Sequence, residues 1–165
     1  MAAIRKFSFT YDVLEDRISC DMEDVEGQTT RLWLTHRLCR GLVSALVPLV
    51  PTAPTDEGAP GRAEALQSWE QAAAMAGFGK LSGVSPAANA ASGLVRAVHI
   101  KHGAGMALTF EFTDGGSRVL PLEFPAVRQS LAVLRGLFDE AGWAADIWPA
   151  WISPPTRPAA RPALN

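Results

Sequence analysis

The chain's three histidines are the side chains best suited to proton transfer or metal binding near neutral pH. His99 and His102 are three residues apart in an extended segment, so their side chains should point to opposite faces, and no third ligand lies nearby. His36 stands beside Arg37 and Arg40 in the first turn of an expected helix, where a surface or partly satisfied histidine is typical. We therefore predict no catalytic residue and no metal site.

A run of acidic residues near the start of the chain could offer oxygen ligands to calcium. Within it, "DMEDVEG" places Val25 where a calcium loop requires a ligand, and its glycine comes one residue late. The pattern is more typical of the solvated face and turns of two strands, where like charges discourage edge-to-edge aggregation. The run comprises Asp12, Glu15, Asp16, Asp21, Glu23, Asp24 and Glu26.

The stretch nearest to a phosphate-binding loop is "AMAGFGKLSG", in which Gly79 and Lys80 match the end of the GxxxxGK[ST] pattern. Ala74 stands where the first glycine belongs, and Leu81 stands where a hydroxyl must reach magnesium. The stretch also follows an expected helix instead of a strand. We predict no nucleotide site there and no cofactor elsewhere in the chain.

Composition narrows the class of protein. The 165 residues are 48% hydrophobic, which suits one domain with its own core. With 15 basic and 17 acidic residues, the chain has no basic excess for a polyanion, so a nucleic-acid partner is disfavoured. Such a partner would need Arg31, Arg37, Arg40 and Arg96 to gather on one face.

Membrane and secretory signals are also missing from the pattern. The longest apolar run, "GLVSALVPLV", is well short of the roughly 20 residues that span a bilayer, and the first residues resemble neither a signal nor a transit peptide. Cys20 and Cys39 fit a reducing compartment, where each would be a small buried hydrophobic residue. These features predict a cytoplasmic protein that does not enter a membrane.

The elements that position these residues follow from the hydrophobic period. Apolar residues alternate in "FSFTYDV", with Phe7 to Val13 on one face, then in "ISCDME" and "TTRLWL", which predicts a meander of three strands. Thr35 is the expected N-cap of a helix that carries leucines at helical spacing. A second helix is expected from Arg62 to Ala76, with Leu66 and Trp69 as its anchors.

The second half of the chain repeats the strand pattern. "LVRAVHIK", "MALTFEF" and "RVLPLEF" predict three strands joined by glycine-containing hairpins, and Pro121 indicates an edge or a bulge in the last. A final helix begins at Pro125 and ends at Gly142. The predicted fold is α+β: a helix-decorated antiparallel sheet or sandwich in residues 1–142, with a flexible loop near 49–61.

Residues 143–165 form a Trp- and Pro-rich strap and tail. Pro149 would disrupt a continuing helix, so an extended aromatic segment is expected after Gly142. Three alternatives exist for it: packing over its own domain, docking onto a second copy or another protein, and contact with a membrane surface. The predicted partner-binding residues are Trp143, Ile147, Trp148 and Trp151.

The element order resembles a known family. A meander from Phe7 to Leu34, two helices after "WLTHRL", three strands from Leu94 to Phe124 and the exiting helix "PAVRQSLAVLRGLF" are similar to the head domain of end-joining repair scaffolds and centriole cartwheel proteins. The resemblance implies a noncatalytic dimerisation and assembly module. In that family the exiting helix leads into a coiled coil, whereas here no heptads follow Gly142.

Together these features predict a noncatalytic intracellular module for assembly or protein interaction. Its partner would be another protein or a second copy, the latter giving a homodimer. The alternative is a small enzyme or ligand-binding protein with a pocket between the helices and the sheet.

Overall fold

The strands form one mixed sheet whose spatial order follows the chain, from β1 to β6. Neighbours pair antiparallel except β3 and β4, which run parallel and are joined by a crossover containing α1 and α2. The elements are β1 (Ile4–Asp12), β2 (Arg17–Asp24), β3 (Thr29–Leu34), α1 (His36–Leu46), η1 (Val47–Leu49), α2 (Arg62–Ala76), β4 (Ala91–His102), β5 (Met106–Phe112), β6 (Ser117–Leu122) and α3 (Phe124–Ala141).

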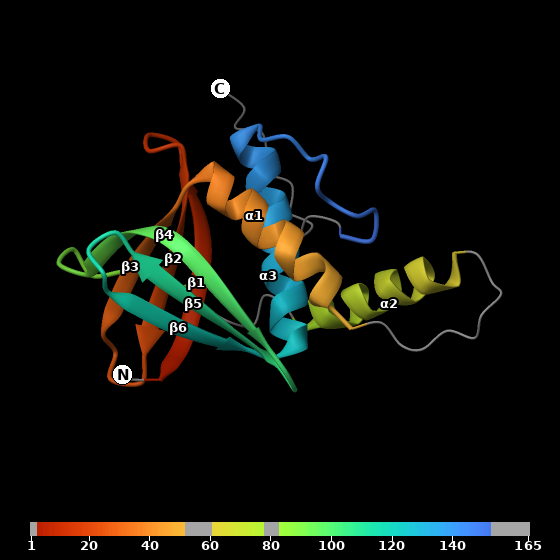
Figure 1. Cartoon of the computed structure of the whole chain (residues 1–165), viewed down its shortest axis with the longest axis horizontal. Helices are drawn as coiled ribbons and strands as arrows, with labels where there is room; N and C mark the ends of the chain where they lie inside the picture. Colours follow the sequence, from red (N-terminus) through yellow and green to blue (C-terminus); the bar gives the residue numbers. More distant parts are fainter. Residues whose placement is uncertain (1–2, 52–60, 78–82, 153–165) are drawn as a thin grey trace, which may run out of the picture.

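In Figure 1, the strands β1–β3 and β4–β6 run in different directions across the view, α1 and α3 lie together beside them, and α2 projects away. The computed structural model describes residues 3–51, 61–77 and 83–152. Most of the loop expected near 49–61, the Gly79–Leu81 stretch and the tail from 153 therefore lie outside the described residues. No helix in the described ranges is long and apolar enough to cross a membrane.

The α+β class and the order of strands and helices are confirmed, with one correction in the sheet. The sequence predicted an antiparallel sheet, but β3 and β4 are parallel, with Thr30 to Trp33 beside Ala91 to Leu94. Hairpin turns fix the direction of the other pairs locally, whereas this pair is separated by the whole helical crossover. Its direction is therefore set by how the helices pack.

One apolar core joins the sheet to the helices. The apolar faces of β2 and β5 are buried, and so is the stripe on α3 formed by Val127, Leu131, Leu134 and Phe138. Gly93 on β4 is required by close packing, because a Cβ there would lie 2.8 Å from the ring of Phe112. The core thus joins residues from both halves of the sheet to residues of α1 and α3.

The two predicted helix caps are confirmed, and the last helix begins at Phe124, one residue before the predicted Pro125. The Thr35 hydroxyl accepts a hydrogen bond from the backbone N–H of Leu38 at 3.3 Å, which caps α1. Gly142 takes the left-handed conformation (φ 67°) that closes α3, and the chain leaves the helix there. The strap therefore begins at a defined point on the domain.

Two residues that were predicted to lie in the core are exposed instead. Val13 is 75% exposed because β1 ends at Asp12 and the hairpin turn follows at once. Trp69 is 69% exposed, whereas Gln67 and Gln71 on the same helix are buried. The reason is that α2 packs on α3 through hydrogen bonds to Arg128, so its polar side faces the protein.

Candidate functional site

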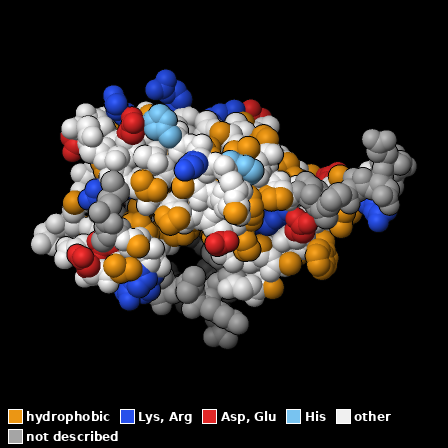
Figure 2. All heavy atoms as spheres, turned by 60° about the horizontal axis from the view of Figure 1, so that its bottom comes forward, with side chains coloured by type: hydrophobic (Ala, Val, Ile, Leu, Met, Phe, Trp, Pro, Cys, Tyr) orange, Lys and Arg blue, Asp and Glu red, His pale blue; other side chains and the backbone are white. Residues whose placement is uncertain are grey.

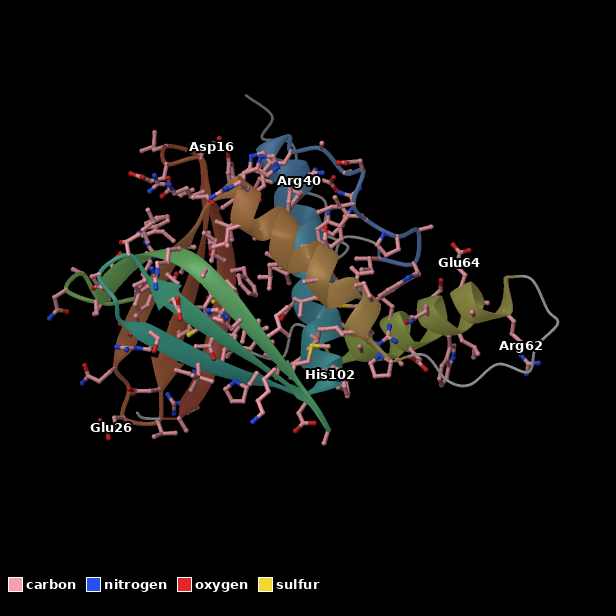
Figure 3. The ribbon with its side chains drawn as sticks, viewed as in Figure 1. Asp16, Glu26, Arg40, Arg62, Glu64 and His102 are labelled. Carbon is pink, nitrogen blue, oxygen red and sulfur yellow. The ribbon has the colours of Figure 1, made fainter. Side chains whose placement is uncertain are left out.

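The Trp-rich strap folds back over its own domain. Trp143 stacks on His36, with ring centroids 4.2 Å apart and planes at 21°, and meets the edge of Phe138 at 5.1 Å. Its indole N–H donates to Asp16 Oδ1 at 3.2 Å. Figure 3 labels Asp16 and Arg40 at the end of the molecule where the strap lies. Trp143 thus ties the β1–β2 hairpin to α1 and α3.

The other predicted partner-binding residues lie further along the strap. Trp148 meets Phe138 edge to face at 5.3 Å, and the guanidinium of Arg128 lies 5.4 Å from the ring centre of Trp151. Ile147 is half-buried against the same core. The structure therefore brings the four residues together on their own domain, and a role for them in binding a partner stays a prediction.

An ion pair holds the strap to α1. Arg40 donates to both carboxylate oxygens of Asp146, at 2.7 and 2.8 Å. The hydrogen bonds from this guanidinium lower the pKa of Asp146 to about 2. The pair satisfies the charge of Arg40 on α1 and the charge of Asp146 on the strap.

The arginines that a nucleic-acid surface would need are mostly neutralised. Arg31 pairs with Asp21 at 2.7 Å, and Arg96 pairs with Glu111 at 3.1 Å, in addition to the Arg40 pair. On the face in Figure 2, acidic and basic side chains are interspersed. These carboxylates compete with phosphate for the same guanidinium groups.

The histidines occupy separate environments. His99 Nε2 lies 3.2 Å from Glu111, and the ring of His102 lies 5.9 Å from that of Phe124. His36 is stacked under Trp143, and its buried Nε2 has no hydrogen-bond partner among the described residues. Within the same ranges, no three His, Cys, Asp or Glu side chains gather in a way that could hold a metal ion.

A different site arises where β3 stops. The parallel pairing ends with Trp33 beside Leu94, and after Leu34 the chain turns into α1. From Val95 to His102, β4 pairs with β5 on one side and, among the described residues, with no strand on the other. A strand edge of this kind presents unpaired backbone N–H and C=O groups.

An apolar groove of about 320 Å³ lies between α1 and β4 beside this edge. Gly41 and Ala45, one helical turn apart, leave the helix wall open, and no atom lies within 4 Å of a Cβ built on Gly41. Arg37 is the groove's one charged side chain, and no described carboxylate pairs with it. The full lining is Arg37, Leu38, Gly41, Leu42, Ala45, Val98 and Ile100.

Sequence reasoning missed this groove. The individual helices and strands were predicted. The packing of α1 beside β4 was not, because the sequence did not show that β3 and β4 pair in parallel. One signal was present in the sequence: Gly41 and Ala45 put two small residues one turn apart on the helix. The observed β4 is 12 residues long against 6 for β3, so its second half extends past its parallel neighbour.

Comparison with known proteins gives no match for this chain among protein-family models, curated proteins or solved structures.

Proposed function

We propose that this protein is a noncatalytic protein-interaction module that binds an extended segment of a partner protein in the groove between α1 and β4. The observation that carries the proposal is the one-sided pairing of β4 from Val95 to His102 beside an apolar groove. The partner segment would add a strand to the sheet, a common mode of peptide recognition.

The backbone of β4 supplies the first part of the recognition. Alternate residues from Ala97 to His102 direct their N–H and C=O groups away from β5. A bound segment would satisfy these groups whatever its side chains are. Affinity from this source is therefore independent of the partner's sequence.

The groove supplies specificity. Side chains alternate along a strand, so every second residue of the segment would face Val98 and Ile100 on one side and Leu38 and Leu42 on the other. These walls favour apolar residues. Arg37 at the rim favours a segment with an acidic group near one end, because no described carboxylate neutralises it.

The composition of the groove also supports a noncatalytic role. Arg37 is its one ionisable residue, and a guanidinium stays protonated at neutral pH, so it cannot serve as a general base. A second copy of the chain is a weaker candidate occupant, because α1 stands along one side of the edge. A separate chain segment enters such a slot more easily than the edge of a whole sheet.

The test uses a synthetic peptide of alternating valine and threonine flanked by glutamates, together with peptides selected from a library of short linear sequences. Wild-type protein should bind in the micromolar range, and amide exchange should slow along Ala97–His102. Gly41→Phe should fill the groove and reduce binding at least tenfold. Gly41→Ala is the matched control, since it adds only a methyl group to the same open position.

Three results would overturn the proposal: no peptide binds, binding leaves amide exchange in β4 unchanged, or Gly41→Phe binds as well as Gly41→Ala. Light scattering on the same samples would detect a dimer. A dimer that Gly41→Phe dissociates would assign the groove to a second copy instead of a partner's segment.

A further inference from the structure

A second hollow, independent of the proposed peptide groove, lies where the two edge strands of the sheet remain unpaired. It is a cleft of about 570 Å³ bordered by the β2–β3 turn, the segment that leads into β4, and the start of β6. The Thr29 hydroxyl accepts a hydrogen bond from the backbone N–H of Ala87 at 3.2 Å. This bond fixes one wall of the cleft against another.

The lining is predominantly polar. Gln28, Thr29, Thr30 and Asn89 provide hydroxyl and amide groups, while buried Met22 is the most deeply placed apolar contact. Side chains of this kind can donate to or accept from a small polar molecule. The volume lies within the range of small-molecule sites.

Arg118 gives this cleft a half-buried positive charge. Its one described hydrogen bond goes to the neighbouring carbonyl of Ser117, at 2.9 Å, although its side chain is half-buried. No described carboxylate lies within ion-pair distance of it. The arginines that do have such a partner are Arg5, Arg17, Arg31, Arg40, Arg96, Arg128 and Arg135.

A half-buried guanidinium without a counter-charge retains unused hydrogen-bond donors, and a planar anion such as a carboxylate matches their geometry. The cleft also contains a carboxylate of its own. Asp24 Oδ1 accepts from the backbone N–H groups of Glu26 and Gln28, both at 2.9 Å, and the described residues give its other oxygen no donor. The site therefore offers one cation and one anion to a ligand.

We propose that this cleft binds a free amino acid. Its carboxylate would be held by Arg118 and its ammonium group by Asp24, with the threonine hydroxyls completing the hydrogen bonds. A simple anion would leave Asp24 unpaired, and a simple amine would leave Arg118 unpaired. A zwitterion satisfies both charges.

Calorimetry on the full chain tests this with the standard amino acids, their amides, which lack the carboxylate, and the corresponding hydroxy acids, which lack the amine. At least one amino acid should bind the wild type more tightly than its amide or hydroxy acid. Arg118→Gln should weaken binding about 10- to 100-fold, and Asp24→Asn, which can still accept the two turn hydrogen bonds, should weaken it as well.

Arg62→Gln is the matched control. Arg62 also lacks a described carboxylate partner, but it lies on the projecting helix α2, and Figure 3 shows it far from Glu26, which belongs to the β2–β3 turn beside the cleft. This variant should bind like the wild type. The proposal would be overturned if no amino acid binds at millimolar concentration, if Arg118→Gln retains full affinity, or if Asp24→Asn leaves the preference for amino acids unchanged.

Discussion

The strap and helix α2 both pack against α3, but different kinds of interaction hold them there. The strap places indole rings against buried Phe138, with centroid distances of 5.1 and 5.3 Å for Trp143 and Trp148. Helix α2 instead presents Gln67 and Glu70 to Arg128, and Gln71 donates to the Arg128 carbonyl at 3.0 Å. One contact is apolar and the other is a buried hydrogen-bond network.

Arg128 lies where the two attachments meet. It is 4% exposed, and its guanidinium donates to Gln67 Oε1 at 2.6 Å, to the Pro51 carbonyl at 3.0 Å and to Glu70. Burial lowers the pKa of this guanidinium, and the Glu70 carboxylate opposes that shift. Ring packing tolerates small displacements, whereas a buried network depends on every partner being in place. The following variants separate the two attachments.

The largest effect is expected from Phe138→Ala. Phe138 is fully buried and touches the rings of His36, Trp143 and Trp148, so the truncation leaves a cavity beneath the strap. We expect the free energy of unfolding to fall by about 3–5 kcal/mol in urea titrations. Phe138→Leu should lose much less because it retains most of the volume. Equal losses in both variants would contradict a packing role.

Arg128→Ala should cost about 3 kcal/mol, because it leaves the Glu70 carboxylate without its Arg128 counter-charge and removes the hydrogen bond from Arg128 to Gln67. Limited proteolysis should then cut α2 before the strap, because the strap loses its Trp151 contact with Arg128 but keeps the packing of Trp143 and Trp148 on Phe138. The double variant Arg128→Met with Glu70→Met should recover most of the loss, since it removes both charges together. A double variant no more stable than Arg128→Ala would show that the network itself is essential for the fold.

Asp146→Asn tests the weaker, exposed contact of the strap. The Arg40 hydrogen bonds lower the pKa of Asp146 from 3.8 to about 2, so the unfolded chain takes up this proton first as the pH falls. The stabilisation is therefore present above about pH 4 and is lost between pH 3.8 and about 2. At neutral pH, Asp146→Asn should lower Tm by about 1–3 °C.

The measurement is the difference in Tm between wild type and Asp146→Asn across pH 2 to 6. That difference should shrink as the pH falls through the stated window and should also shrink in high salt. Asp139→Asn is a control on α3, where the pair with Arg135 does not hold the strap. A difference that is constant with pH would rule out the ion pair as its source.

The same contrast explains what the sequence could predict. Elements with a clear hydrophobic period were correct: the α3 stripe is buried, Thr35 caps α1 and Gly142 ends α3. Trp69 was misplaced because the prediction assumed that a helix turns its largest apolar residue inward. The buried charge of Arg128 reversed that preference, and periodicity carries no information about a hydrogen-bond partner on another helix.

The two candidate sites could not be predicted from the sequence for a related reason. The α1–β4 groove depends on where β3 stops relative to β4, and the polar cleft depends on Arg118 lacking a partner that most other arginines have. Both are properties of long-range pairing. The strap residues could be found from composition alone, but their neighbours His36, Tyr11 and Asp16 come from distant parts of the chain.

The smallest effect is expected from Trp69→Ala. Trp69 is 69% exposed on the outer side of α2, so its removal should change the free energy of unfolding by less than about 0.5 kcal/mol, with the helix propensity of alanine offsetting part of any loss. Leu66→Ala, at a half-buried position on the same helix, should cost more. If Trp69→Ala instead costs more than about 1.5 kcal/mol, and the loss grows with protein concentration, Trp69 is buried against a second copy in solution. In that case, because α2 packs on α3 through its polar side, its apolar side would form the contact between the two copies.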